Sequence, residues 1–186
     1  VDVNMLRRWR FLFYADGFRQ INRANGVDNP SWGYDLQFQA QYFTTSEISM
    51  NWRIRARMKQ MVYTNSLRWQ LLYESAGWQL KTQLDANLTD DLNWGASVLQ
   101  DIQYTFSACP VTLQLRLQAF DARNWANRIY VYENDVLYAF SIPATYGQGG
   151  RFYLNMRWRA LDRLSVYLRA SETLTRTSNR TDIHLL

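Results

Sequence analysis

The chain has 186 residues, of which 47% are hydrophobic, 20% are charged and 16% are aromatic, and its formal net charge is +5. This composition excludes a disordered tail, and the length is that of one domain able to bury a core or close a barrel. No run of about 18 apolar residues occurs, which excludes a membrane-spanning helix. Cys109 and His184 are the only residues of their types. Disulfide scaffolds and zinc sites are therefore improbable, and we expect neither a metal nor a cofactor.

The main signal along the chain is an alternation of apolar and polar residues with period two, which is typical of strands with two different faces. The segment 47–59 is the clearest case. Its apolar positions are Ile48, Met50, Trp52, Ile54, Ala56 and Met58, and its polar positions are Ser49, Asn51, Arg53, Arg55, Arg57 and Lys59. The same alternation recurs on both sides of this segment.

In chain order, the alternating segments between turn-forming residues predict about twelve strands. They lie at 4–14, 34–43, 47–59, 66–74, 77–88, 92–106, 110–120, 127–132, 135–142, 151–160, 163–171 and 181–186. The connections are mostly short, so successive strands should pair antiparallel. No linker divides residues 1–186, and we predict a single all-β domain.

Alternation alone does not say whether the apolar face covers a soluble core or meets lipid. Several strands reach the roughly 9–11 residues that cross a bilayer when tilted. The polar face is rich in Arg and Gln, whereas Lys59 and Lys81 are the only lysines, which suits a confined polar interior. Aromatic residues at strand ends would form the two interfacial girdles of a membrane barrel, namely Tyr42, Trp78, Trp94, Tyr104 and Trp158.

These features favour an antiparallel transmembrane β-barrel in a bacterial outer membrane, closed alone or as part of a larger barrel. A soluble β-sandwich or propeller is the alternative. In the barrel, the short turns at one end would face the periplasm and the longer loops at the other end would face outward. The lipid bilayer with its lipopolysaccharide would then be the first partner.

One stretch carries a family resemblance. The residues RIYVYENDVLYAFSIP at 128–143 and YGQGGRFYL at 146–154 resemble a segment of the β-barrel proteins of Bacteroidetes-type outer membranes, and the resemblance is most specific over about 128–170. In that family the barrel often follows helix-hairpin-helix modules of the competence type. This sequence contains no such module, so no DNA-related role is carried over. It also ends at Leu186 without the terminal aromatic residue of such barrels, which suggests a fragment that lacks N-terminal and a few C-terminal residues.

A lumen lined by arginine predicts two alternative functions. In the first, a porin-like channel favours anionic solutes through Arg53, Arg55, Arg57, Lys59, Arg116, Arg157, Arg159 and Arg169. In the second, these cations pair with carboxylates and pack the interior, and the barrel anchors or scaffolds a larger outer-membrane complex for secretion, assembly or uptake. Other subunits of such a complex would be its partners.

Catalysis and nucleic-acid binding are not expected. His184 is the only histidine, and the nearby hydroxyls Ser178 and Thr181 form no nucleophile motif with it. The basic and aromatic residues alternate strictly, so they lie on opposite faces of each strand and cannot form a stacking platform beside a charged groove. Gln100 is the one clear polar residue within an outward apolar series, which indicates a bulge, a protein contact or a local register shift.

Overall fold

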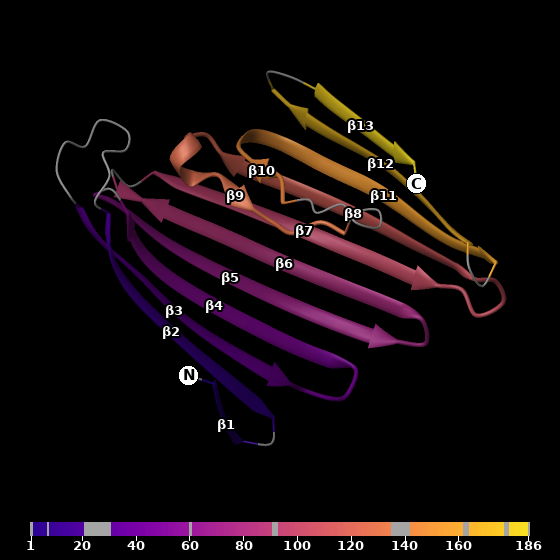
Figure 1. The fold of residues 1–186 in the computed structure, drawn as a ribbon, viewed down its shortest axis with the longest axis horizontal. Helices are drawn as coiled ribbons and strands as arrows, with labels where there is room; N and C mark the ends of the chain where they lie inside the picture. Colours follow the sequence, from indigo (N-terminus) through magenta and orange to yellow (C-terminus); the bar gives the residue numbers. More distant parts are fainter. Residues whose placement is uncertain are drawn as a thin grey trace.

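The computed structural model describes residues 2–6, 8–20, 31–59, 61–90, 93–134, 142–161, 164–176 and 179–185. One antiparallel sheet of eleven strands dominates the fold, and its spatial order is β1-β2-β3-β4-β5-β6-β7-β8-β11-β12-β13 (Figure 1). Nine of these strands have 12–15 residues: β2 (Trp9–Gln20), β3 (Ser31–Phe43), β4 (Ile48–Lys59), β5 (Val62–Ser75), β6 (Trp78–Thr89), β7 (Trp94–Thr105), β8 (Val111–Ala122), β11 (Gly147–Leu161) and β12 (Leu164–Thr175). The predicted all-β antiparallel fold class is confirmed.

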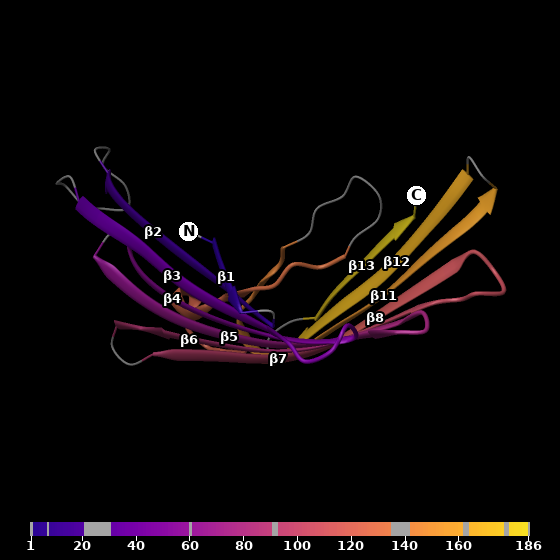
Figure 2. The same ribbon diagram turned by 90° about the horizontal axis from the view of Figure 1, so that it is seen from below.

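Two shorter strands, β1 (Asp2–Leu6) and β13 (Asn179–Leu185), form the edges of the sheet. In the part of the chain that the structure describes, these edges do not pair with each other. The sheet is strongly curved, and both edges rise on the same side of a trough (Figure 2). The closed barrel and the count of about twelve strands stay predictions.

The period-two alternation gives the trough two chemically different faces. Inside β7, Ser97 and Leu99 are buried on the concave face, whereas Val98 between them is 46% exposed on the convex face. Gln100 also lies on the convex side, and its partner Thr82 is in unbroken register, so the predicted local register shift is wrong. Its side-chain oxygen instead accepts a hydrogen bond of 2.6 Å from the Thr82 hydroxyl.

Several neighbouring strands are joined by tight turns. Ala76 and Gly77, with φ of 47° and 85°, form the two-residue connection between the paired Ser75 and Trp78. Positive φ at both positions matches the right-handed twist of the adjoining strands. A Cβ on Gly77 would meet the Thr105 carbonyl oxygen at 2.7 Å, so this glycine also allows the neighbouring turn to approach.

The predicted first strand, 4–14, is in fact two strands. The chain reverses direction between Leu6 and Trp9, which lie opposite each other in the antiparallel pair of β1 and β2.

The predicted wall strand 127–132 is wrong, because β8 pairs directly with β11 and nothing lies between them in the sheet. Residues 123–134 and 142–146 instead lie in the trough (Figure 2). They contain a 3-10 turn, η2 (Trp125–Asn127), and two short paired strands, β9 (Ile129–Tyr130) and β10 (Ala144–Thr145). We call them the interior segment. The predicted strand 135–142 lies outside the described residues except for Ile142.

The interior segment leaves the wall because its apolar side chains have a place to pack on the concave face. Ile129 and Val131 are 2% and 3% exposed and form the small core of the molecule with Leu99 of β7. Leu99 lies on the concave face of β7 between the polar residues Ser97 and Asp101. None of the described segments forms a helix long and apolar enough to cross a membrane.

Candidate functional site: the basic concave face

The centre of the concave face is a buried ionic cluster around Glu133 of the interior segment. The Glu133 side chain is fully buried and receives two hydrogen bonds from Arg151 of β11, at 2.6 and 2.8 Å. Arg169 of β12 donates to the same carboxylate, and an Arg116 nitrogen lies 4.0 Å from it. Three cations from three adjacent strands of the wall therefore surround one carboxylate.

Arg116 of β8 has its own partners beside this cluster. Its guanidinium forms a two-point pair with Asp101 of β7 and donates to the Tyr132 carbonyl oxygen at 2.8 Å. The Tyr153 ring lies between Arg116 and Arg169, with its centroid 5.1 Å from each guanidinium carbon. Burial of charge is tolerated here because every guanidinium in the cluster meets carboxylate, carbonyl or aromatic partners.

The backbone of the interior segment is bound to the wall along its length. Asn87 of β6 donates to the Arg128 carbonyl oxygen at 3.2 Å, and Arg68 of β5 donates to that of Tyr130 at 2.9 Å. The Thr89 hydroxyl donates to the side-chain oxygen of the fully buried Asn127 at 2.7 Å. Wall side chains thus replace the ladder hydrogen bonds that a strand in the sheet would make.

Close approach of this segment depends on Gly95 of β7. A Cβ at Gly95 would lie 2.7 Å from the Asn127 carbonyl oxygen, which is closer than any normal contact. The glycine therefore clears the space for η2.

A second group of cations lies towards the end of the sheet where the chain passes from β4 to β5. Arg53, Arg55 and Arg57 of β4 line a cavity of about 220 Å³ together with Arg128 of the interior segment. Arg55 pairs with Asp35 of β3, and the nearest nitrogen of Arg57 is 3.9 Å from that carboxylate. Lys59 ends the same row and is exposed. All four predicted cations of this strand thus lie on the polar face of β4.

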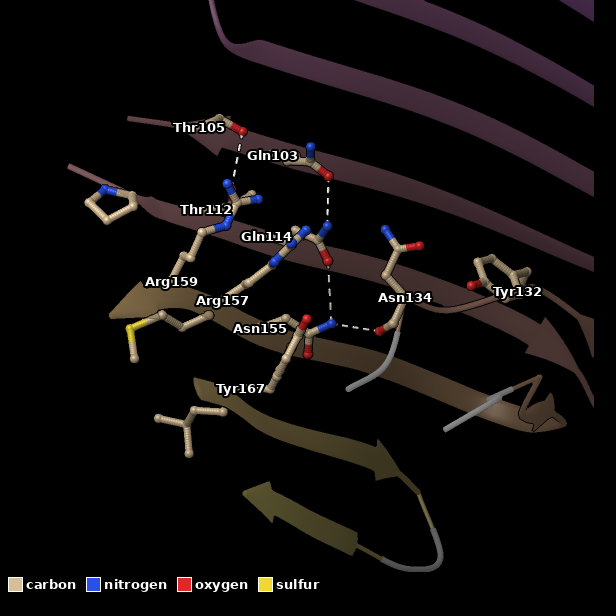
Figure 3. Close-up of a pocket in the computed structure, with 13 residues that line it drawn as sticks. Gln103, Thr105, Thr112, Gln114, Tyr132, Asn134, Asn155, Arg157, Arg159 and Tyr167 are labelled. Atoms are coloured by element: carbon tan, nitrogen blue, oxygen red, sulfur yellow. Dashed lines mark hydrogen bonds between the residues drawn. The ribbon is translucent and has the colours of Figure 1, made fainter. Parts of the chain in front are cut away.

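The third group lies at the opposite end of the trough. Arg157 and Arg159 of β11 line a cavity of about 550 Å³ with Gln103, Gln114 and Asn155 (Figure 3). Both arginines are exposed, and neither forms an ion pair within the described part of the chain. The predicted row of cations is therefore divided into paired and unpaired members.

The predicted aromatic girdle residues lie on the convex face of the sheet, at the ends of their strands. Tyr42, Trp78, Tyr104 and Trp158 lie near one end of the sheet, where Trp78 and Tyr104 have ring centroids 4.4 Å apart. Trp94 begins β7 at the other end and is 58% exposed.

The sequence analysis missed Glu133, which falls between the predicted strands 127–132 and 135–142, and it missed the Tyr153 ring between two guanidiniums. One signal for Glu133 was available, because a polar face with many arginines and few carboxylates requires buried anions from elsewhere. Among the described residues, no group of three His, Cys, Asp or Glu side chains is placed to hold a metal ion. Only the backbone of His184 is described, opposite Arg169, so the absence of catalysis stays a prediction.

No protein-family model matches this chain, and no curated protein matches it significantly. The resemblance to Bacteroidetes-type barrels therefore stays a prediction.

Proposed function

We propose that this chain forms the wall of a transmembrane β-barrel in a bacterial outer membrane and serves there as an anchor or scaffold with a packed interior. The proposal rests on the contrast between the two faces of one sheet. The convex face is apolar and exposed, whereas the concave face is polar and is covered at its centre by the interior segment around the buried Glu133.

The convex face supports a lipid environment. Leu84, Val98, Leu117 and Leu154 come from four adjacent strands and are 45–51% exposed. An apolar band across so many strands exceeds the patches that soluble monomers usually expose. Strands of 12–15 residues are also long enough to cross the hydrocarbon region with residues to spare.

Backbone groups in lipid must be hydrogen-bonded, which requires the two edges of the sheet to be paired. In the proposed barrel, β1 and β13 pair with each other or with further strands of a larger wall. The eleven strands alternate in direction, so β1 and β13 run the same way and a direct pair between them would be parallel. A fully antiparallel barrel needs an odd number of further strands between these two edges.

Cysteine accessibility along β7 tests the membrane assignment. The exposed Cys109 is first replaced by serine (Cys109→Ser). Single cysteines are then introduced into this background by Val98→Cys and Thr105→Cys. In lipid vesicles, a membrane-impermeant maleimide should label position 105, at the end of the strand, and leave position 98 unlabelled. Equal rapid labelling of both positions would contradict a lipid-facing convex surface, and labelling after detergent denaturation controls for reactivity.

An anion-selective channel is the second candidate function. The row Arg53, Arg55 and Arg57, with its cavity beside the interior segment, is the observation that favours it. Conductance of the purified protein in a planar bilayer, with reversal potentials under a salt gradient, decides between the two. Steady anion-selective steps that shift towards cations in the Arg55→Glu/Arg57→Glu variant would establish a channel, and a silent bilayer with confirmed insertion would support the packed interior.

A further inference from the structure

The cavity at Arg157 and Arg159 differs in its charge from the buried centre of the concave face. The buried cations at that centre have carboxylates beside them, such as Asp101 for Arg116 and Glu133 for Arg151. The described residues that line this cavity of about 550 Å³ include two arginines and no Asp or Glu. The cavity is therefore a positively charged space with no carboxylate among the described residues of its lining.

The two arginines are placed to act on one group. They are two residues apart on the same face of β11, so their Cα atoms are about 7 Å apart. The Arg159 backbone N–H donates to the Pro110 carbonyl oxygen at 2.9 Å, which fixes the strand against the neighbouring turn. The Arg157 guanidinium lies 5.8 Å from the Tyr167 ring centroid. Guanidiniums of this kind bind the oxygens of phosphate or carboxylate groups with paired N–H donors.

A row of amides forms the wall of the cavity next to the arginines. The Gln114 amide donates to the Gln103 side-chain oxygen at 2.6 Å, and the Asn155 amide donates to the Asn134 carbonyl oxygen at 2.6 Å (Figure 3). The Asn155 side-chain oxygen is buried and has no hydrogen-bond partner in the described part of the chain. A buried acceptor without a donor is costly, and a hydroxyl group from a ligand would satisfy it.

We propose that this cavity binds a small molecule that carries both an oxyanion and hydroxyl groups, of the class of sugar phosphates or acidic sugars. Arg157 and Arg159 hold the phosphate or carboxylate, and Asn155 accepts a hydrogen bond from a ligand hydroxyl. The site lies within one face of the described sheet, so it does not depend on the membrane assignment.

Isothermal titration calorimetry of the detergent-solubilised chain tests the site with three probes: glucose 6-phosphate, inorganic phosphate and glucose. We expect glucose 6-phosphate to bind more tightly than phosphate, because only the sugar phosphate satisfies both halves of the site. We expect glucose alone to show no measurable binding. The Arg157→Gln/Arg159→Gln variant should weaken glucose 6-phosphate binding by about tenfold or more.

The matched control is Arg123→Gln, since Arg123 is an exposed arginine that pairs with Asp121 away from the cavity. This variant should bind glucose 6-phosphate as the wild type does. The proposal would be overturned if the wild type bound none of the probes, or if the Arg157→Gln/Arg159→Gln variant kept its affinity while Arg123→Gln behaved identically. Equal affinity for phosphate and glucose 6-phosphate would overturn the role of Asn155.

Discussion

Arg151 and Arg157 lie on the same face of the same strand, yet their surroundings are opposite. Arg151 is 7% exposed and bound to Glu133, whereas Arg157 is exposed and has no carboxylate beside it in the described part of the chain. The difference comes from the interior segment, whose Glu133 reaches only the first of the two. One strand thus carries both a structural cation and a cation free to meet a ligand, and the alternation of the strand does not distinguish them.

The largest effect should come from removing the carboxylate that separates the two environments. Glu133→Ala leaves Arg151 and Arg169 buried without their shared anion, and loss of one member of a buried ion pair costs about 3–5 kcal/mol. Urea unfolding of the refolded protein in detergent, followed by tryptophan fluorescence, measures the change. Glu74→Ala, at an exposed glutamate, is the control, and equal stability of the two variants would show that the cluster is not structural.

The comparison of Arg151 with Arg157 is tested most directly by reversing the charge at each position in turn. Arg151→Glu places a second carboxylate against Glu133 and should cost several kcal/mol, on the order of the loss in Glu133→Ala. Arg157→Glu, at an exposed position, should change the free energy of unfolding by about 0.5 kcal/mol or less. Similar losses in both variants, measured by the same urea titrations, would mean that the two arginines share one environment after all.

A smaller effect is expected where the interior segment approaches the wall. Gly95→Ala introduces a Cβ 2.7 Å from the Asn127 carbonyl oxygen, so η2 must shift, at a cost of about 1–3 kcal/mol. Limited proteolysis should then cleave the chain near residues 123–128 faster than in the wild type. Gly17→Ala serves as the control, because a Cβ at Gly17 meets nothing within 4 Å. Unchanged cleavage of Gly95→Ala would show that the segment does not depend on this contact.

The smallest effect should occur on the convex face, where the described residues form no cluster of charges. Gln100→Leu removes the hydrogen bond to Thr82, and such bonds between side chains in lipid contribute about 0.6 kcal/mol on average. The urea midpoint in detergent should therefore move only slightly. A double-mutant cycle with Thr82→Val gives the pair energy, and a coupling of several kcal/mol would show that this contact is as important as the Glu133 cluster.

The wall was largely readable from the sequence, because period two is a local property. The alternation at 47–59 gave the faces of β4 correctly, including the common face of Arg53, Arg55 and Arg57. The interior segment could not be predicted, because a local alternation does not show whether a segment lies in the wall or inside the trough. Ile129 and Val131 alternate with Tyr130 and Tyr132 as a wall strand would, and only the packing against Leu99 shows that they turn inward.

The ion pairs depend on register, which the sequence alone does not specify. Arg55 meets Asp35 because those residues lie diagonally across β3 and β4, where Asp35 is directly opposite Arg57. A shift of two residues along either strand would keep every face and change every pair. The separation of paired from unpaired arginines therefore had to come from the structure.

The direct pairing of β8 with β11 has a kinetic consequence. Every other neighbouring pair in the sheet is also adjacent along the chain or nearly so, and such hairpins close quickly at little cost in chain entropy. Only the β8–β11 ladder joins strands that are separated along the chain by the 24 residues between Ala122 and Gly147. We expect this one long closure to limit the folding rate, so that the strands before β8 form one early unit and β11 to β13 join it afterwards.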